Sequence, residues 1–562
     1  MRRLICFFLL TLFLGSSAQA EPAHRQMVAA ANPIAAQAGL DVLRAGGTAM
    51  DAAVAVQMML GVVEPQSSGL GGGAVMLVFD AATGRTTSWD GRETAPAAAQ
   101  PDLFLDQAGK PVAFQDAVRS GRSVGVPGAI RMLEAAWKIH GKLPWSDLVL
   151  PSAKLAADGF VVSPQLAQVI AANAGTLRQE AIRNYLLTPA GLPLPAGTLL
   201  RNSALADTLR AVAASGADAL YRGPIAADIA LTVRSDRNPG LLTADDLAAY
   251  QPRERPVVCG LYRERRICGM GPPSSGGIAV LQMLGMLKGF DIPAMPPDSA
   301  QPIELVIEAE RLAYADRDRY LGDSGYVAVP VAGLIDPQYL ARRAERIDPK
   351  HANLSPPAGD PSFAGAISPA QASQPPQEEH GTSHIAVVDA EGNAVSLTTT
   401  IEGPFGAGLM THGFLLNNEL TDFSFRPEIN GRPVANRVEP GKRPRSSMAP
   451  TLVFGADGKL QYVVGSQGGG RIIGFVALAL VRMLDWDYTP AEAAAAPRIE
   501  TLGGAVELEA GTHAETLAEP LRAMGETVRV MAIDSGFHAI RSGAEGIVGG
   551  ADPRREGVAV GD

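Results

Sequence analysis

The sequence predicts an α+β protein in which helices are layered against sheets. Strand patterns come in adjacent pairs after residue 382, at 383–400 and at 451–464, and an apolar helical pattern follows them at 472–484. Between about residues 120 and 350, helical patterns alternate with short strands. Paired strands followed by helices are typical of layered α+β domains. With 562 residues, the chain is long enough for a large core and more than one subdomain.

The first 20 residues have the pattern of a secretory signal peptide. Arg2 and Arg3 precede an apolar run over 4–14, and Ala18-Gln19-Ala20 is an A-x-A cleavage site. A membrane anchor is the alternative, but the run is too short to span a bilayer comfortably. We therefore expect a periplasmic or secreted protein with no membrane span after signal removal.

Composition argues against several classes of partner. The formal net charge is −10, and it becomes −12 (−10 minus 2) when Arg2 and Arg3 leave with the signal. Nucleic-acid binding needs a basic footprint, so we expect no nucleic-acid partner. No grouping of Cys and His has metal-ligand spacing, and we expect neither a metal nor another cofactor.

Two helices and a glycine-rich loop are predicted near the N-terminus of the mature chain. The first helix, over 34–45, ends at Gly46-Gly47, and Thr48 caps the second helix. The loop over 67–73 then leads into a strand over 74–79. A dinucleotide fingerprint requires strand, loop and helix in that order, so we expect these glycines to serve close backbone packing instead.

The next helix with a distinctive pattern, over 303–320, carries many charges. They are Glu304, Glu308, Glu310, Arg311, Asp316, Arg317 and Asp318. Charges gathered on one side of a helix usually form a solvated face, and we expect that here.

Two cysteines remain in the mature chain. A two-residue hairpin turn at Arg263-Glu264 would place Cys259 opposite Cys268, as a closely spaced pair without backbone hydrogen bonds. An exported compartment permits a disulfide, which is our hypothesis. Two unpaired apolar cysteines are the alternative.

Thr382 stands at the seam between a loose segment and a strand. The segment over 351–380 holds six prolines, and only Gly381 separates it from Thr382. A cut before Thr382 would free its amine, whose unperturbed pKa is about 7.7–8.0. That amine can act as the base that a weakly nucleophilic hydroxyl needs.

A second threonine and a pair of glycines could assist Thr382. Thr400 lies at the far end of the hairpin that Thr382 begins, where it can hydrogen-bond to Thr382. Gly468 and Gly469 open the apolar helix and offer backbone N–H groups that suit an oxyanion. A flexible turn before a core helix is the alternative reading of these glycines.

The order of motifs along nearly the whole mature chain resembles the γ-glutamyltranspeptidases. The matching motifs from Thr382 onward are Thr382-Ser383-His384, Gly392-Asn393-Ala394-Val395, Asn417-Asn418-Glu419 with Asp422-Phe423, Lys442-Arg443-Pro444 with Ser446-Ser447, Gly468-Gly469 with Arg471, and Ala551-Asp552-Pro553-Arg554. Those before it are Gly69-Leu70-Gly71-Gly72-Gly73, Arg92-Glu93, Pro272-Pro273-Ser274-Ser275-Gly276-Gly277 and Glu308 to Asp323.

The resemblance implies the four-layer αββα sandwich of the N-terminal-nucleophile hydrolases, and an enzyme that cuts itself. Thr382 would attack the Gly381 carbonyl and leave a large subunit, 21–381, and a small subunit, 382–562, paired as a heterodimer. The linker, about 351–380, would then have to clear the pocket. The freed Thr382 would take a γ-glutamyl group from glutathione or a related compound as an ester, which water, an amino acid or a short peptide resolves.

The resemblance also implies a donor site. Arg92 would bind the donor α-carboxylate, with help from the hydroxyls of Ser446 and Ser447. Asp422 and Glu419 would hold the α-ammonium, with Glu402 nearby. Three carboxylates in a small pocket repel one another, so we expect at least one raised pKa.

One difference from the family and two further expectations concern the same pocket. Many members of the family have Asn and Gln where this chain has Glu402 and Glu419. The segment over 423–442, which varies as a lid in the family, has no Tyr or Trp, so we expect a weak or absent aromatic lid. His384 lies beside the nucleophile, but we expect a structural role, because the amine already supplies the base.

Two alternative functions remain. A cephalosporin acylase of the same fold would take a glutaryl side chain, which lacks an α-ammonium, and Asp422 with Glu419 argues against it. A non-catalytic exported binding protein is the other alternative, and it would remain a single chain.

Overall fold

The computed structural model describes residue 23 and residues 25–363, 371–374 and 381–562. The predicted signal peptide, 1–20, lies outside these residues, as do 364–370 and 375–380 of the predicted linker. Within the described ranges, no helix has both the length and the apolar character needed to cross a membrane.

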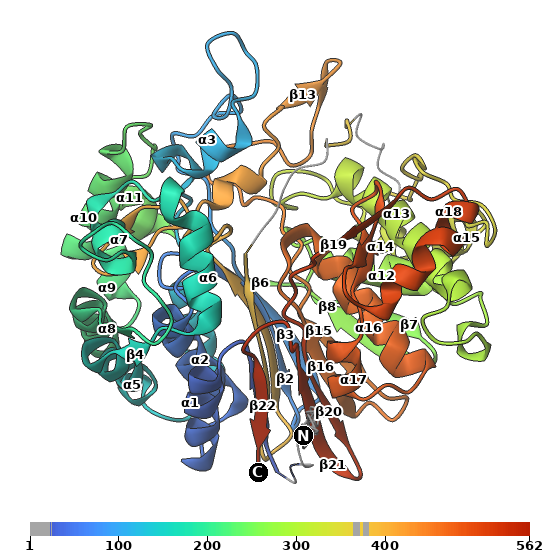
Figure 1. Cartoon of the computed structure of the whole chain (residues 1–562), viewed down its shortest axis with the longest axis horizontal. Coiled ribbons are helices and arrows are strands. Elements are labelled where there is room, and N and C mark those ends of the chain that lie inside the picture. Colours follow the sequence, from blue (N-terminus) through green and yellow to red (C-terminus); the bar gives the residue numbers. More distant parts are fainter. Residues whose placement is uncertain (1–22, 24, 364–370, 375–380) are drawn as a thin grey trace, which may run out of the picture.

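Two mainly antiparallel sheets form the centre of the molecule (Figure 1). The seven-stranded sheet has, in order, β22 (Val558–Gly561), β1 (Met27–Ala30), β9 (Ser383–Val388), β10 (Ala394–Thr400), β2 (Gly73–Asp80), β3 (Arg85–Gly91) and β6 (Arg253–Arg255). The six-stranded sheet has β21 (Gly546–Ala551), β20 (His538–Gly543), β16 (Leu460–Gly465), β15 (Thr451–Phe454), β8 (Arg265–Gly269) and β7 (Val258–Tyr262).

Smaller sheets lie at the periphery. They are β17 (Ile499–Thr501) with β18 (Val506–Glu509) and β19 (Val528–Met531), β11 (Met410–Thr411) with β12 (Phe414–Leu415), β13 (Glu428–Ile429) with β14 (Arg432–Pro433), and β4 (Phe160–Val161) with β5 (Leu199–Leu200). The β13–β14 hairpin projects from the top of the molecule in Figure 1 and lies within the predicted lid segment.

Helices cover both outer faces of the paired sheets (Figure 1). Beside the seven-stranded sheet lie α1 (Pro33–Arg44), α2 (Ala49–Val63), α4 (Ala129–His140), α5 (Trp145–Asp158), α6 (Pro164–Asn173), α7 (Glu180–Leu186), α8 (Ser203–Ser215), α9 (Asp218–Tyr221), α10 (Gly223–Arg234) and α11 (Ala244–Ala249). Beside the six-stranded sheet lie α12 (Gly276–Leu287), α13 (Ala300–Tyr320), α14 (Val331–Leu334), α15 (Pro337–Ala344), α16 (Ile472–Asp485), α17 (Pro490–Ala495) and α18 (Ala518–Ala523). The short α3 (Phe114–Val118) lies near the top of the view, above the helices beside the seven-stranded sheet (Figure 1).

Alternating apolar residues explain this layering, because successive side chains of a strand face opposite sides of its sheet. In β9, Ile385 and Val387 join the apolar cluster that includes α1 and α2, while Ala386 and Val388 join the cluster between the sheets. A third cluster joins the six-stranded sheet to α12, α13 and α16. The predicted four-layer αββα sandwich is therefore confirmed.

Both sheets contain strands from before and from after Thr382. In the seven-stranded sheet β9 pairs with β1, and β10 pairs with β2. In the six-stranded sheet β15 pairs with β8. The chain on either side of Thr382 thus shares two continuous sheets, and a cut at that point would leave every one of these pairings intact.

The N-terminal elements match the prediction. Thr48 and Asp51 form a capping box at the start of α2. The glycines of the loop that follows serve close packing, because a Cβ atom at Gly72 would lie 2.0 Å from the Thr400 carbonyl oxygen and one at Gly71 would lie 2.1 Å from the Leu415 carbonyl oxygen. The loop thereby holds the end of β10 in place.

The hairpin β7–β8 carries the predicted disulfide. Cys259 and Cys268 are directly paired across the two strands, with their Cα atoms 4.1 Å apart, and a disulfide links them.

The prediction that the charges of α13 form a solvated face is wrong. Glu304, Glu308, Glu310, Arg311, Asp316 and Arg317 are all buried, and the Asp318 side chain is only 22% exposed. Partners from other segments compensate two of these charges: Arg311 pairs with Glu526, and Asp316 pairs with Arg343. The local sequence pattern does not show this burial, because the partners are remote in sequence.

We predict that Gly72→Ala lowers the free energy of unfolding by about 1–3 kcal/mol, because its Cβ would overpack against the Thr400 carbonyl. Urea denaturation followed by fluorescence measures this. Gly175→Ala is the matched control, since a Cβ at Gly175 meets open space. Equal stability of the two variants would contradict the close-packing role of Gly72.

Candidate active site

Thr382 lies immediately before β9, next to the end of β10. Ser383 pairs with Thr399, so the next position outward brings Thr382 beside Thr400. Both threonines are buried. Thr400 Oγ1 accepts a hydrogen bond of 2.7 Å from the Glu402 N–H, and its own hydroxyl proton can therefore be donated to another acceptor.

A small cavity of about 10 Å³ adjoins Thr382. It is lined by Arg92, Thr382, Thr400, Glu402, Glu419, Asp422, Ser446, Ser447, Met448, Gly469 and Ile472. Nine of these eleven residues are those that the sequence singled out, drawn from segments more than 300 residues apart. Gly468 is the one predicted pocket residue outside this lining.

The backbone on both sides of the Gly381–Thr382 bond has an unusual conformation. Thr382 has φ of 103° and Gly381 has φ of 79°. A positive φ is a genuine outlier for a β-branched residue and costs on the order of 1–3 kcal/mol. Gly381 also needs to be glycine for space, because a Cβ there would lie 1.6 Å from the Glu402 carbonyl oxygen. The peptide bond before Thr382 is thus held in a strained segment.

The carbonyl of Thr382 is held by a group that the sequence did not single out. With its amide oriented to suit its partners, Gln467 donates a 2.7 Å hydrogen bond to the Thr382 oxygen and accepts one of 2.8 Å from Arg555. Next to Thr382, Ser383 donates a 3.1 Å hydrogen bond to Glu64, a carboxyl whose pKa burial raises to about 7. Gln467 and Glu64 stand in no motif of recognisable spacing, so only the folded chain reveals them.

Arg92 forms the electrostatic centre of the cavity. Its two terminal nitrogens donate to Glu419 and Asp422. Its Nη2 also donates to the Arg445 carbonyl at 3.0 Å, and its Nε to the Pro444 carbonyl at 3.2 Å. These contacts fix the guanidinium plane, so Arg92 presents a rigid fork in a buried position.

More than one carboxylate surrounds the single positive charge of Arg92. Glu93, which the sequence-based site omitted, is fully buried with its Oε2 4.0 Å from Arg92 Nη1, and burial raises its pKa to about 8. Burial also raises the pKa of Glu419 well above its usual range; Arg92 opposes this effect, while Glu93 and Glu402 add to it. The predicted raised pKa is present, but its main cause is burial and not mutual repulsion.

The remaining polar groups of the cavity are each held by the surrounding fold. Asn418 donates to the Glu402 carboxylate from the loop before η4 (Glu419–Asp422). Ser447 Oγ accepts a 2.6 Å hydrogen bond from Arg317 Nη2, which explains why this arginine of α13 is buried. Ser446 Oγ accepts from the Met448 N–H at 3.0 Å.

The predicted oxyanion glycines lie at the start of η5 (Gly469–Arg471), which continues into α16. Gly468 has φ of 137° and Gly469 has φ of 57°, in the left-handed region that favours glycine. Gly469 borders the cavity and Gly468 precedes it in the same turn.

His384 is buried in β9 away from the cavity lining. Its Nδ1 lies 2.9 Å from Thr398 Oγ1, and burial lowers its pKa well below the usual value. A neutral, fully packed imidazole agrees with the structural role that we expected for it.

A second hydroxyl stands in a motif of hydrolases. Gly121-Arg122-Ser123-Val124-Gly125 matches the G-x-S-x-G pattern of serine hydrolases. Ser123 lies in η1 (Gly121–Ser123), and its hydroxyl is directed at the carbonyls of Val118 (2.9 Å) and Ser120 (2.7 Å). This arrangement is a local cap and not the exposed strand-to-helix elbow that the motif requires.

Comparisons with known proteins agree on one family. A sequence profile of gamma-glutamyltranspeptidase matches residues 35–562. The glutathione hydrolase proenzyme of Bacillus subtilis (strain 168) is 40% identical over 544 residues, covering 95% of this chain and 91% of the relative. The acylase ACY 1 proenzyme of Pseudomonas sp. (strain SE83) is 36% identical over 535 residues, with 94% and 91% covered. The crystal structure of cephalosporin acylase from Bacillus halodurans superposes with a TM-score of 0.85 at 27% identity, covering 99% of each chain.

Proposed function

The chain belongs to the gamma-glutamyltranspeptidase family, and on that basis we propose that Thr382 is the nucleophile of its acyl-transfer reaction. The protein is a self-processing γ-glutamyl transferase and glutathione hydrolase. The observation that carries the assignment of Thr382 is the cavity beside it, which gathers the Thr382 hydroxyl, one buried arginine and three carboxylates.

Self-cleavage is the first step of the proposal. Thr382 Oγ attacks the Gly381 carbonyl carbon, the C–N bond breaks, and the acyl group passes to oxygen as an ester. Water then hydrolyses that ester, which leaves a carboxylate on Gly381 and a free amine on Thr382. The positive φ of Thr382 supports this step, because strain in the uncut chain is relieved when the bond breaks.

Transfer of the γ-glutamyl group follows the same chemistry. The Thr382 amine removes the proton of its own hydroxyl, and Oγ attacks the γ-carbonyl of glutathione. The N–H groups of Gly468 and Gly469 stabilise the oxyanion, and the leaving amine of cysteinylglycine takes the proton. Water, an amino acid or a short peptide then attacks the ester, releases the γ-glutamyl group and restores Thr382. The Thr400 hydroxyl orients Thr382 in both steps.

The donor's own charges would open the ion pairs around Arg92. The γ-glutamyl group ends in an α-carboxylate and an α-ammonium. Its carboxylate replaces Glu419 and Asp422 on Arg92, and its ammonium takes up the two carboxylates that this exchange frees. Because each buried charge keeps an opposite partner, the exchange avoids leaving a charge unpaired. The cavity of about 10 Å³ must widen as the groups part.

The paired subunits are the second structural part of the proposal. Residues 21–381 and 382–562 would remain together as a heterodimer because β9 and β10 are hydrogen-bonded between β1 and β2. We further propose export with removal of residues 1–20, which places the enzyme in an oxidising compartment suited to the Cys259–Cys268 disulfide.

We predict that Thr382→Ala abolishes both cleavage and γ-glutamyl transfer, because alanine lacks the hydroxyl. Denaturing electrophoresis would show one chain in place of two, and release of p-nitroaniline from a γ-glutamyl anilide would fall to background. Thr382→Ser is the matched control and should still cleave, more slowly. A Thr382→Ala chain that is cut between 381 and 382 would exclude the self-cleavage mechanism.

The acylase alternative yields a second prediction, since an acylase is among the similar structures. A glutaryl anilide lacks the α-ammonium, and losing a charged hydrogen bond of about 1.5–3 kcal/mol corresponds to roughly 10–150-fold in kcat/KM. We expect kcat/KM for the γ-glutamyl anilide to exceed that for the glutaryl anilide by that factor. Glu419→Gln should bring the two kcat/KM values closer together. Equal kcat/KM values of the wild type for the two anilides would favour acylase activity.

Donor binding should weaken as pH falls. The raised pKa of Glu419 means that this carboxyl takes up a proton before an ordinary glutamate does, and the protonated form cannot pair with the ammonium. We expect the donor KM to rise as pH falls, beginning above the range in which an ordinary glutamate takes up its proton. Glu419→Gln, which cannot titrate, should show a flatter profile. A wild-type profile that stays flat as pH falls would contradict the assignment of Glu419 to the ammonium.

A further inference from the structure

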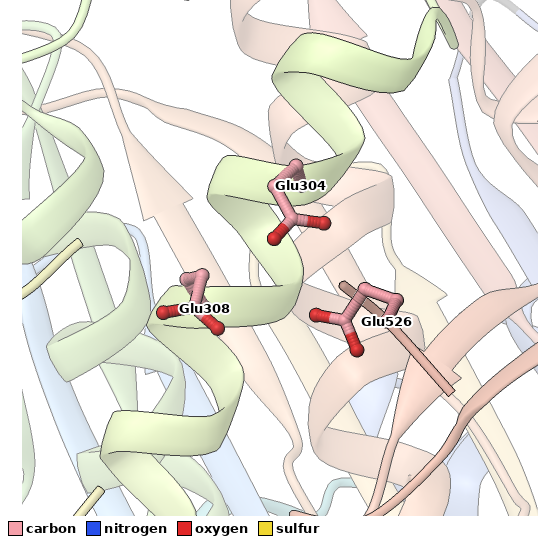
Figure 2. A group of neighbouring side chains, drawn as sticks. All are labelled: Glu304, Glu308 and Glu526. Carbon is pink, nitrogen blue, oxygen red and sulfur yellow. The ribbon is translucent and has the colours of Figure 1, made fainter. Parts of the chain in front are cut away.

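Three glutamates far from Thr382 meet in the interior beside α13. Glu304 and Glu308 are one helical turn apart on α13, and Glu526 comes from the loop between α18 and β19. Figure 2 shows the three carboxylates turned toward a common space. One oxygen from each lies within 4.8 Å of the others, and the side chains are buried.

The nearby guanidinium does not balance these carboxylates. Arg311 donates to both oxygens of Glu526, at 2.9 and 2.8 Å, and also to Glu308. Glu308 accepts a further hydrogen bond of 3.0 Å from the Asn353 N–H. Three carboxylates and Arg311 sum to a formal charge of −2.

Glu304 differs from the other two glutamates. It is 0% exposed, and neither of its oxygens has a hydrogen-bond partner within the part of the chain that the structure describes. A buried carboxylate without a partner is costly, so natural structures pair such groups with a cation, a metal or a proton. Glu304 points toward the Glu308–Glu526 pair, where an occupant would satisfy all three side chains (Figure 2).

We propose that Glu304, Glu308 and Glu526 bind a divalent cation of the calcium class. A charge of +2 neutralises the group completely. Oxygens on opposite sides of Ca²⁺ lie about 4.6–5.2 Å apart, twice the usual bond length, so a single ion can reach all three carboxylates. Mg²⁺ usually keeps several waters, and a buried set of protein carboxylates suits Ca²⁺ better.

The position of this site gives the ion a structural role. Glu304 and Glu308 precede Thr382 in the chain, and Glu526 follows it, so the ion would tie together the two pieces that self-cleavage creates. The same group touches Asn353, at the start of the segment that leads to Thr382. The binding site itself does not depend on which residue is the nucleophile.

Calcium binding to the processed protein tests the proposal. After EDTA treatment and dialysis at about pH 8.5, CaCl₂ should raise the melting temperature by about 2 °C or more, and equilibrium dialysis with radioactive calcium should count one tight site per heterodimer. Glu304→Gln should weaken that site at least tenfold. Glu310→Gln is the matched control: it changes a buried glutamate of the same helix outside the group, and should leave calcium binding unchanged.

Protons are the competing occupant, because burial raises the pKa of Glu304 to about 8. A carboxyl with a raised pKa stabilises the fold at acidic pH and loses that contribution as pH rises toward about 8. Proton occupancy therefore predicts no calcium response, and a Glu304→Gln protein more stable than the wild type at about pH 8.5. The two outcomes together would overturn the proposal. Equilibrium dialysis that counts no calcium bound to the wild type would also overturn it.

Discussion

The antiparallel pairing of β9 with β10 is the constraint on which the site depends. It fixes Ser383 opposite Thr399, so the residue before β9 must emerge beside the end of β10. The strand end is in turn held by the backbone contact between Gly72 and the Thr400 carbonyl. Because a one-residue slip would turn every side chain of β9 to the other face of the sheet, the apolar residues that layer the core also place Thr382.

Burial keeps the Arg92 guanidinium rigid and free of water, but it also makes the surrounding carboxylates harder to ionise. Arg92 is held by two carboxylates and two backbone carbonyls, which leaves it rigid and fully desolvated. Glu93 and Glu419 are ionised with difficulty at this depth, and their pKa values are raised. A donor that brings one positive and one negative charge fits such a site, since it supplies a partner for each group that it displaces.

Buried charges also occur on the side of the molecule that holds the six-stranded sheet. Helix α13 runs through the interior, where Arg311 pairs with Glu526 and Asp316 pairs with Arg343, and through Arg317 it also holds Ser447 at the pocket. Strands from both sides of Thr382 are hydrogen-bonded to each other in the two sheets. In the proposed self-cleavage, the bond before Thr382 can therefore break while the strands around it remain paired.

The sequence by itself determined the local structure: the hairpins after Thr382, the capped helix after Thr48, and the register that joins Cys259 to Cys268. These features depend on neighbours in the chain, and the ordered motifs further identified most of the pocket lining. Only the tertiary structure decided that the charges of α13 are buried, that Glu93 lies beside the Arg92 guanidinium, that Gln467 holds the Thr382 carbonyl, and that Glu526 meets Glu304. Whether a charged side chain is solvated or paired depends on segments hundreds of residues away, and no local pattern encodes which segments those are.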